Sequence, residues 1–401
     1  MSVLAINGGN PIRTEPFPGW PSYSEEMIGH MASVLRTGKV NYWTGEEGRR
    51  FEEEYARSVG VMYAIALANG TLALEAALHA LGIGPGDEVI VTSRTFIASA
   101  SCVVMRGARP VLCDVDRESQ DLTAETIRAS LTPHTKAIIA VHLAGWPCDM
   151  DPIMKLAREH KLYVIEDCAQ ANGATYKGRA VGSLGHVGAF SFCQDKIITT
   201  GGEGGMLVTN DRTVWELVWS YKDHGKNWDA VYNRSHPPGF RWLHESFGTN
   251  WRMTEMQAAL GRLQLKILPE WIDDRRRNAA SLNDCFSRIP AIRTTLPGPG
   301  IGHAYYKYYA FIRQEELAAG WNRDRVIEAV NAEGIPCFSG SCSEIYLEKA
   351  FPESWRPKER FAVARELGET SIMFLVHPTL STDDMESVCA AVEKVMTVAV
   401  R

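Results

Sequence analysis

The chain has 401 residues, 45% of them hydrophobic and 22% charged, which is the composition of an ordinary globular protein. This length exceeds the usual size of a single hydrophobic core, so we expect two domains. The formal net charge of −6 argues against nucleic acid or an anionic membrane as a partner, since neither attracts an acidic protein.

The sequence also lacks the signals of export and of metal binding. No apolar run approaches the roughly 20 residues of a membrane span, and the first residues do not read as a signal peptide. The nine cysteines are scattered, odd in number and without a C-x-x-C pair, which favours reduced thiols over disulfides or a zinc site. We therefore predict a cytoplasmic protein without a metal centre.

In chain order, the predicted elements begin with an arm over residues 1 to about 45, rich in Pro, Gly and Trp, with one helix near 25–35. Apolar runs typical of strands then alternate with helix-periodic segments. The strands are predicted over 63–67, 88–91, 110–115, 136–141, 162–165, 188–192 and 206–209, and the helices over 71–81, 98–106, 124–130, 152–160 and 214–222. This alternation predicts an α/β sheet whose ligands bind beyond the carboxyl ends of the strands.

The pattern changes after residue 259. A long helical region runs to about residue 286, and a mixed α+β stretch follows, with a strand over 305–313 and a helix over 382–396. We place the domain boundary near residue 265. This gives a large domain over 1–264, which includes the arm, and a smaller domain over 265–401.

A single lysine stands where the chain leaves the predicted strand 188–192. It is followed by a glycine-rich turn over 201–205. An ammonium beside Ile197 and Ile198 loses hydration, which favours the neutral amine at Lys196, and a neutral amine attacks an aldehyde. On this segment alone, Lys196 could equally be a surface lysine in a loop.

The ends of the predicted strands also carry a helix start, an aromatic ring, a carboxylate and a hydroxyl. Gly70 and Thr71 open a helix whose free N–H groups favour a phosphate, although such residues also serve as plain caps. Phe96 could stack on a flat heterocycle or could simply pack in a core. Asp167 ends an apolar strand and needs a cationic partner if it is buried, and Ser191 could donate a hydrogen bond to a phosphate.

These groups together match the needs of pyridoxal 5′-phosphate. That cofactor takes a lysine as its Schiff-base partner, an aspartate on the ring nitrogen and a helix N-terminus on its phosphate. Lys196, once displaced by an incoming amine, would be the base that moves the proton.

Five ordered motifs carry a resemblance to a known family. They are Ala68-Asn-Gly-Thr-Leu-Ala-Leu, Pro85-Gly-Asp-Glu-Val-Ile-Val followed by Thr95-Phe96, Val164-Ile-Glu-Asp-Cys-Ala-Gln170, Ser191-Phe-x-x-x-Lys196 with Gly202-Glu-Gly-Gly, and Gly248-Thr-Asn-Trp-Arg-Met-Thr-Glu-Met-Gln-Ala-Ala. The chain resembles the DegT/StrS family of sugar aminotransferases, which depend on pyridoxal 5′-phosphate and have fold type I. The resemblance implies a large domain with a mostly parallel seven-stranded sheet and a smaller C-terminal α+β domain.

The resemblance also implies roles for individual residues. Lys196 would hold the cofactor, Asp167 would pair with the pyridine nitrogen, Gln170 would lie near the ring hydroxyl and Phe96 would stack on the ring; Gly70, Thr71 and Ser191 would hold the phosphate, and Asn250 would reach the phosphate of a neighbouring subunit. A homodimer with shared active sites is therefore expected. The unusual residues 193–195 before the lysine leave the substrate pocket open.

Members of the family transfer an amino group, usually from glutamate or glutamine, to nucleotide-linked keto sugars or in some cases to keto cyclitols. His303, Tyr305 and Tyr306 fall where the family has substrate-side residues, although alternating tyrosines on a half-buried strand explain them equally well. Two further alternatives are a sugar dehydratase, in which the lysine position is histidine, and a non-enzymatic regulatory protein on the same fold. Lys196 argues against the first, and Lys196 with Asp167 against the second.

Overall fold

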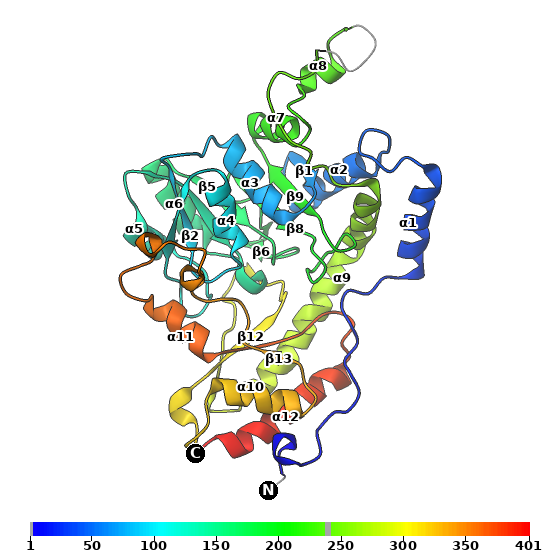
Figure 1. The fold of residues 1–401 in the computed structure, drawn as a ribbon. Helices are drawn as coiled ribbons and strands as arrows, with labels where there is room; N and C mark the ends of the chain where they lie inside the picture. The colour runs from blue at the N-terminus through cyan, green and yellow to red at the C-terminus, as the bar shows by residue number, and fades with distance from the viewer. Residues whose placement is uncertain (1–2, 237–241) are drawn as a thin grey trace.

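A seven-stranded sheet forms the centre of the larger part of the molecule (Figure 1). The computed structural model describes residues 3–236 and 242–401. In chain order the strands are β1 (Tyr63–Leu67), β2 (Glu88–Thr92), β3 (Arg109–Cys113), β4 (Thr135–Val141), β5 (Tyr163–Asp167), β8 (Val187–Ser191) and β9 (Gly205–Thr209). Their order across the sheet is β1-β9-β8-β5-β4-β2-β3. The predicted α/β fold is confirmed, and all seven predicted strands are present, with ends within two residues of those expected.

The direction of the strands defines the functional edge of this sheet. Strand β9 alone runs antiparallel to its neighbours β1 and β8, whereas β8, β5, β4, β2 and β3 are mutually parallel. The carboxyl ends of six strands therefore meet at one edge. The loops that leave this edge carry most of the predicted site residues, as expected for an α/β sheet.

Helices cover both faces of the sheet (Figure 1). Residues of α2, α5 and α6 pack on one face and those of α3, α4 and α7 on the other. The helices of this part are α1 (Glu25–Thr37), α2 (Glu47–Val59), α3 (Gly70–Ala80), α4 (Ala98–Met105), α5 (Ala124–Ser130), α6 (Met150–His160), α7 (Arg212–Tyr221), α8 (Trp228–Tyr232) and α9 (Glu255–Phe286). No helix within residues 3–236 and 242–401 combines the length and apolar character that crossing a bilayer requires.

The central strands are buried on both sides, which explains why their sequences are continuous apolar runs rather than alternating ones. In β4, Ile138 and Ala140 belong to the core on one face, while Ile139 and Val141 belong to the core on the other. Polar side chains are therefore confined to the strand ends, and that is where a site can form.

A smaller sheet organises the C-terminal part of the chain. Its order is β10-β12-β14-β13, and it packs with α10, α12 and the end of α9. Its elements are β10 (Ile292–Thr294), β12 (Tyr308–Ile312), β13 (Cys337–Phe338), β14 (Ser371–Phe374), α10 (Arg323–Ala332), α11 (Ala362–Thr370) and α12 (Thr382–Ala399). A short third sheet, β11 (Ile301–Gly302)-β6 (Thr175–Tyr176)-β7 (Arg179–Ala180), joins segments from both parts. The boundary predicted at residue 265 lies inside the continuous helix α9, and the division there remains a prediction.

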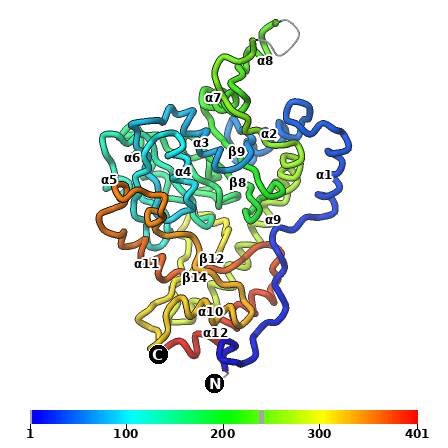
Figure 2. Tube along the Cα trace, in the orientation of Figure 1, coloured from blue at the N-terminus to red at the C-terminus, as the bar shows by residue number. Residues whose placement is uncertain are grey.

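The N-terminal arm begins against the small C-terminal part and runs along the molecule to α1 (Figure 2). Leu4 is buried in the core of that part. The fully buried carboxylate of Glu333, just after α10, accepts hydrogen bonds from the backbone nitrogens of Ala5 at 2.8 Å and Ile12 at 3.1 Å. The same carboxylate forms an ion pair with Lys394 on α12 at 2.7 Å. One buried acid thus ties the arm to two helices.

We predict that Glu333→Ala destabilises the protein by about 3 kcal/mol, because it removes the ion-pair partner of the partly buried Lys394 and leaves two backbone N–H groups unsatisfied. Urea unfolding measures the loss, and limited proteolysis should show early cleavage within residues 1–20. Glu328→Ala, an exposed position on the same helix, is the matched control and should change the unfolding free energy by less than about 0.5 kcal/mol. An equal effect of the two substitutions would contradict the anchoring role.

Candidate active site

Two neighbouring acids end strand β5, and strand alternation sends their side chains to opposite faces. Glu166 is fully buried and accepts hydrogen bonds from the backbone nitrogens of Gly182, Leu184 and Gly185 at 2.6–2.8 Å. It also contacts the buried ring of His142 at 3.0 Å. These bonds satisfy the carboxylate, so Glu166 fixes the turn over 182–185 and has a structural role.

Asp167 is buried at the carboxyl end of β5 and forms no ion pair with another described residue. Its two oxygens accept hydrogen bonds from the hydroxyl of Ser99 at 2.7 Å and the backbone nitrogen of Ala169 at 3.1 Å. In the part of the chain that the structure describes, no lysine, arginine or histidine forms an ion pair with it. Burial raises the pKa of Asp167, because these hydrogen bonds do not fully offset its desolvation. His142 and Lys196 also act to lower this pKa without reversing the effect of burial, so a further positive charge beside the carboxylate would stabilise it.

Lys196 lies in the loop between β8 and β9, with its side chain 17% exposed. Its Nζ is 3.3 Å from the hydroxyl oxygen of Tyr306, which comes from the segment before β12, and 3.5 Å from Oδ1 of Asp195. The indole nitrogen of Trp20, in the N-terminal arm, donates to the backbone oxygen of Lys196 at 2.9 Å. Two distant parts of the chain, the N-terminal arm and the segment before β12, thus converge on this lysine.

The charged groups around Lys196 shift one another's pKa values. Tyr306 donates a hydrogen bond to Asp195. Burial alone would raise the pKa of Asp195, but Lys196, the Tyr306 hydroxyl and Lys307 outweigh it and lower that pKa below its ordinary value. Burial lowers the pKa of Lys307 to about 8, helped by the positive charges of Arg275 and Lys196. An acid from the same loop and a second lysine from the segment before β12 therefore lie near Lys196.

A small cradle lies where helix α3 begins beside the end of β8. A Cβ atom added at Gly70 would lie 2.7 Å from the Cβ of Ser191, so only glycine allows this approach. The side chain of Asn69 caps the helix by accepting from the backbone nitrogen of Leu72 at 3.0 Å. Thr71 is exposed beside these groups. The first turn of α3 thus lies beside Ser191, and the N-terminus of a helix is a position that favours an anion such as a phosphate.

The glycine-rich turn after Lys196 uses its glycines in two ways. Gly201 and Gly202 have φ angles of 84° and 122°, which side chains disfavour. Gly204 is tightly packed, since a Cβ there would lie 2.0 Å from the hydroxyl of Thr200. The turn therefore depends on glycine both for its backbone angles and for its close packing.

Phe96 and Gln170 were both predicted to contact a ring. The ring of Phe96 is 69% exposed, which removes the alternative of a buried packing role. Gln170 is partly buried, and its side-chain oxygen accepts from the backbone nitrogen of Ala144 at 2.7 Å, which fixes the direction of its amide. Both side chains follow strands at the functional edge.

The residues from 303 to 306 have two kinds of contact: some pack against each other, and one reaches Lys196. The ring of His303 stacks on that of Tyr305 with centroids 3.8 Å apart, and its Nδ1 accepts from the Tyr305 backbone nitrogen at 2.8 Å. Burial, with Arg276 nearby, lowers the pKa of His303 to about 3. Among these three predicted residues, the structure brings Tyr306 into contact with Lys196 and gives His303 and Tyr305 contacts with each other.

Asn250 lies on the surface. It does not cap helix α9, because Thr254 occupies that position and forms a capping box with Gln257. The adjacent Trp251 accepts a hydrogen bond from the backbone nitrogen of Ala68 at 2.9 Å, which places the tract alongside the end of β1. Within the described residues, no contact joins Asn250 to Lys196.

Three residues of this site escaped the sequence analysis. Ser99 sits one helical turn after Phe96, a spacing that could have suggested it. Asp195 stood out only as part of an unusual loop before the lysine. Trp20 carried no signal, because its role depends on the path of the arm.

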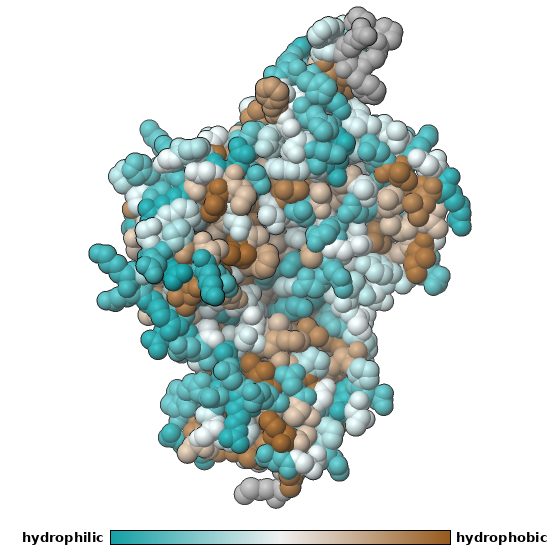
Figure 3. All heavy atoms as spheres, in the orientation of Figure 1, coloured by the Kyte–Doolittle hydropathy of each residue, from teal (hydrophilic) through white to brown (hydrophobic). Residues whose placement is uncertain are grey.

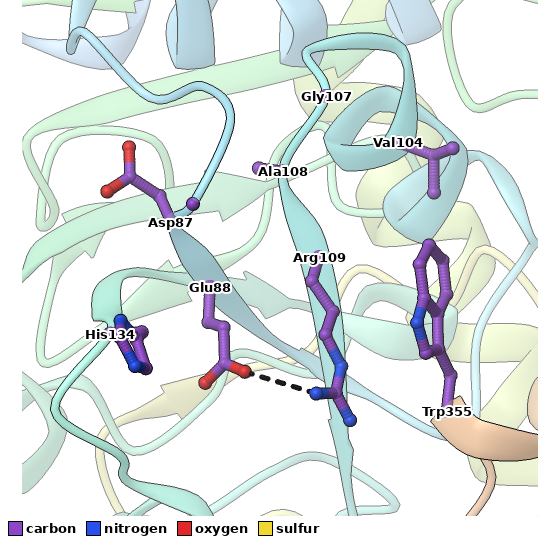
Figure 4. Close-up of a pocket in the computed structure, with 9 residues that line it drawn as sticks. Asp87, Glu88, Val104, Gly107, Ala108, Arg109, His134 and Trp355 are labelled. Atoms are coloured by element: carbon purple, nitrogen blue, oxygen red, sulfur yellow. Dashed lines mark ion pairs between the residues drawn. The ribbon is translucent and has the colours of Figure 1, made fainter.

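A cavity of about 320 Å³ lies at the opposite end of the strands (Figure 4). Glu88 and Arg109, the first residues of β2 and β3, form an ion pair across it at 3.4 Å, and the ring of Trp355 faces it. Because these are the amino ends of the parallel strands, this cavity is separate from the site around Lys196.

Comparison with known proteins decides what the site belongs to. The model of the DegT/DnrJ/EryC1/StrS aminotransferase family matches residues 21–393. The chain belongs to this family. The aminotransferase has a TM-score of 0.94 and 56% identity to a solved aminotransferase from Psychrobacter cryohalolentis, over 95% of this chain and 99% of that one.

Two curated relatives carry names that specify a reaction. GDP-perosamine synthase from Caulobacter vibrioides is 39% identical, over 88% of this chain and 92% of its own length. L-glutamine:2-deoxy-scyllo-inosose aminotransferase from Streptoalloteichus tenebrarius is 36% identical, over 90% of this chain and 86% of its own length. The first name states a GDP-linked product, and the second states an amino transfer from glutamine to 2-deoxy-scyllo-inosose.

Aminotransferases of this family use pyridoxal 5′-phosphate, and the residues described above fit it. Asp167 is a buried carboxylate without an ion-pair partner among the described residues, which suits a protonated ring nitrogen. The close approach of Gly70 to Ser191 leaves a cradle for a phosphate. Phe96 presents an exposed ring and Lys196 an amine at the same edge.

Proposed function

We propose that the aminotransferase moves an amino group from glutamate or glutamine to the carbonyl of a nucleotide-linked keto sugar, in amino-sugar and polysaccharide biosynthesis. The observation that carries the reaction type is that Lys196 and Asp167, a buried carboxylate without an ion-pair partner among the described residues, lie at the same sheet edge. The name of the relative from Caulobacter vibrioides supports a nucleotide-linked product.

Bound pyridoxal 5′-phosphate supplies an aldehyde that accepts the amino group and a ring that withdraws electrons from the carbon losing its proton. Lys196 would hold the cofactor and, when released, take the proton of the donor's α-carbon on Nζ and return it to the carbon that had carried the cofactor's aldehyde. Asp167 would hold the proton on the ring nitrogen, because a carboxylate in this dry position gains strongly from a cation.

The remaining residues would bind and orient. We assign the phosphate to Gly70, Thr71 and Ser191, the face of the ring to Phe96 and the neighbourhood of the ring hydroxyl to Gln170. These assignments rest on their shared place at the carboxyl ends of the strands. A substrate contact is proposed for Tyr306, which faces Lys196, and the substrate role predicted for His303 and Tyr305 stays a prediction.

The runner-up acceptor is a keto cyclitol, which the name of the Streptoalloteichus tenebrarius relative favours. A dehydratase and a regulatory protein have weaker support, because Lys196 is present and lies at the same sheet edge as Asp167. We also propose a cytoplasmic location, supported by nine free cysteines, six of them buried.

The acceptor is tested with the cofactor-loaded protein and ¹⁵N-labelled glutamate or glutamine. The panel contains GDP-, UDP- and dTDP-linked keto sugars and an unlinked keto cyclitol, and mass spectrometry detects the replacement of a carbonyl oxygen by a labelled amine. We expect labelled product from a nucleotide-linked sugar. Labelling of the cyclitol alone would contradict this proposal and would favour a keto cyclitol as the acceptor.

We predict opposite effects of Asp167→Asn on catalysis and on stability. Turnover should fall at least about a hundredfold, because the fixed charge that stabilises the reacting ring is lost. The cofactor-free protein should gain roughly 1 kcal/mol at pH 8, because a buried uncompensated charge is removed. Steady-state rates and thermal unfolding measure the two effects, and loss of stability together with loss of activity would indicate a structural acid instead.

The pH dependence of the unfolding free energy tests the same interpretation of Asp167. The pKa of Asp167 is raised in the folded protein, so ionisation is less favourable there than in the unfolded chain. Stability of the cofactor-free native protein should therefore fall as pH rises between the ordinary aspartate value and the raised one. Asp167→Asn should abolish that part of the pH dependence.

We further propose a homodimer in which Asn250 completes the phosphate site of the other subunit. Asn250 is exposed and has no capping role, and Phe247, three residues earlier, is fully exposed. Hydrophobic residues also gather over the region of α1, where Ile28 and Leu35 are more than half exposed (Figure 3). Apolar surface of this kind is typical of an interface.

Co-expression of Lys196→Ala and Asn250→Ala chains tests the shared site. A hybrid dimer would contain one site with both lesions and one with neither, so random pairing should restore about a quarter of native sites. Activity of tagged hybrids, against each parent alone, is the measurement. Hybrids that recover nothing although the subunits exchange would place Asn250 outside the neighbouring site.

A further inference from the structure

Two groups of opposite charge, Asp195 and Lys307, share the Tyr306 side chain with Lys196. Oδ1 of Asp195 is 3.5 Å from its Nζ. The Nζ atoms of Lys196 and Lys307 each lie 4.8 Å from the centroid of the Tyr306 ring. The Tyr306 hydroxyl accepts from Lys196 at 3.3 Å and donates to Asp195. One tyrosine thus touches all three charged groups.

We propose that Asp195 and Lys307 are an opposed pair of charges that sets the protonation of the Lys196 nitrogen, with Tyr306 as the positioning residue. This inference rests on the proposed role of Lys196 as the cofactor lysine. It assigns a function to the loop before the lysine and to a second lysine, neither of which the reaction described above uses.

Asp195 favours the protonated nitrogen. A carboxylate within about 4–6 Å stabilises a neighbouring positive charge, and the interaction is mutual. The lowered pKa of Asp195 reports the same attraction from the other side, since Lys196 is the strongest of the effects that lower it. The side chain is 54% exposed, so solvent screens the attraction and keeps it modest.

Lys307 opposes protonation of Lys196, because a like charge nearby disfavours the charged form. Burial lowers the pKa of Lys307 to about 8, with further contributions from Arg275 and Lys196. Lys307 is therefore charged below about pH 8 and loses its opposing effect above that pH. The balance between Asp195 and Lys307 changes within the range in which an enzyme works.

Three other ionisable groups face this cluster from other elements. Arg275 on α9 is fully buried and donates to the backbone oxygen of Tyr306 at 3.2 Å. Burial lowers the pKa of His377, after β14, to about 3, so this ring is neutral. Asp167 lies at the end of β5. All three are unchanged in the variants below, so they do not contribute to differences between them.

The opposed pair has a chemical consequence. The Lys196 nitrogen must be neutral to attack a carbonyl or to take a proton, and it must carry a proton at the stage that follows. A single strong carboxylate would hold the ammonium too firmly, and a single lysine would prevent its formation. When the effects of Asp195 and Lys307 balance, the Lys196 nitrogen can both gain and release a proton at the pH at which the enzyme works.

The test uses the cofactor-loaded full chain, whose visible absorbance reports whether the nitrogen shared with Lys196 is protonated. The midpoint pH of the absorbance titration should fall by about 0.5–1 unit in Asp195→Asn and rise by about the same amount in Lys307→Met. In a Tyr306→Phe background the shift caused by Asp195→Asn should shrink to less than about half. Packing damage alone would not move the two single variants in opposite directions.

Asp151→Asn is the matched control, because Asp151 pairs with an exposed Lys177 on the surface. Its midpoint should stay within about 0.2 unit of the native value. Shifts of Asp195→Asn and Lys307→Met in the same direction, or shifts no larger than this control, would overturn the proposal.

A second readout separates this inference from the proposed cofactor role. Competitive acetylation of the cofactor-free protein across pH, read by peptide mass, measures the reactivity of the Lys196 amine directly. Below about pH 8, where Lys307 is charged, Asp195→Asn should raise the acetylation rate of the Lys196 amine and Lys307→Met should lower it, and the absence of these opposite changes overturns the proposal. A titrating band that persists in Lys196→Ala would refute the cofactor role of Lys196, while the acetylation result still stands for or against the charge pair.

Discussion

The structure depends most on one unfavourable interaction, the burial of the Asp167 carboxylate at the end of β5. An uncompensated charge in such a place is expensive, and two hydrogen bonds only partly offset its desolvation. The neighbouring Glu166 shows the contrast, because four hydrogen bonds make it a purely structural acid. A fold keeps an unsatisfied acid when a ligand completes it, and the pyridinium nitrogen of the family's cofactor is a suitable cation.

Much of the larger part could be predicted because its signals are local. Each buried strand is a short apolar run, and each site residue follows the end of such a run, so the parallel arrangement alone brings Gly70, Phe96, Asp167 and Ser191 to one edge. Lys196 follows the same rule. A strand pattern does not show how closely Gly70 approaches Ser191 or that Phe96 is exposed. These two features come from the structure.

The rest could not be predicted because it depends on contacts between distant segments. Trp20 and Tyr306 reach Lys196 only through the path of the arm and the placement of the small part. The helix α2 was missed because its charged sequence hides a buried stripe of Phe51, Tyr55 and Val59. The strands β13 and β14 are too short for a periodic pattern. These long-range contacts are also the ones that set the electrostatics around the lysine.

The central claim is that Lys196, and not the nearby Lys307, is the lysine that holds the cofactor. The most direct measurement is borohydride reduction of the native cofactor-loaded protein, followed by digestion and peptide mass mapping. The account predicts the reduced cofactor on the peptide that contains Lys196, with Lys307 unmodified. Attachment at Lys307, at any other lysine, or at none would contradict it.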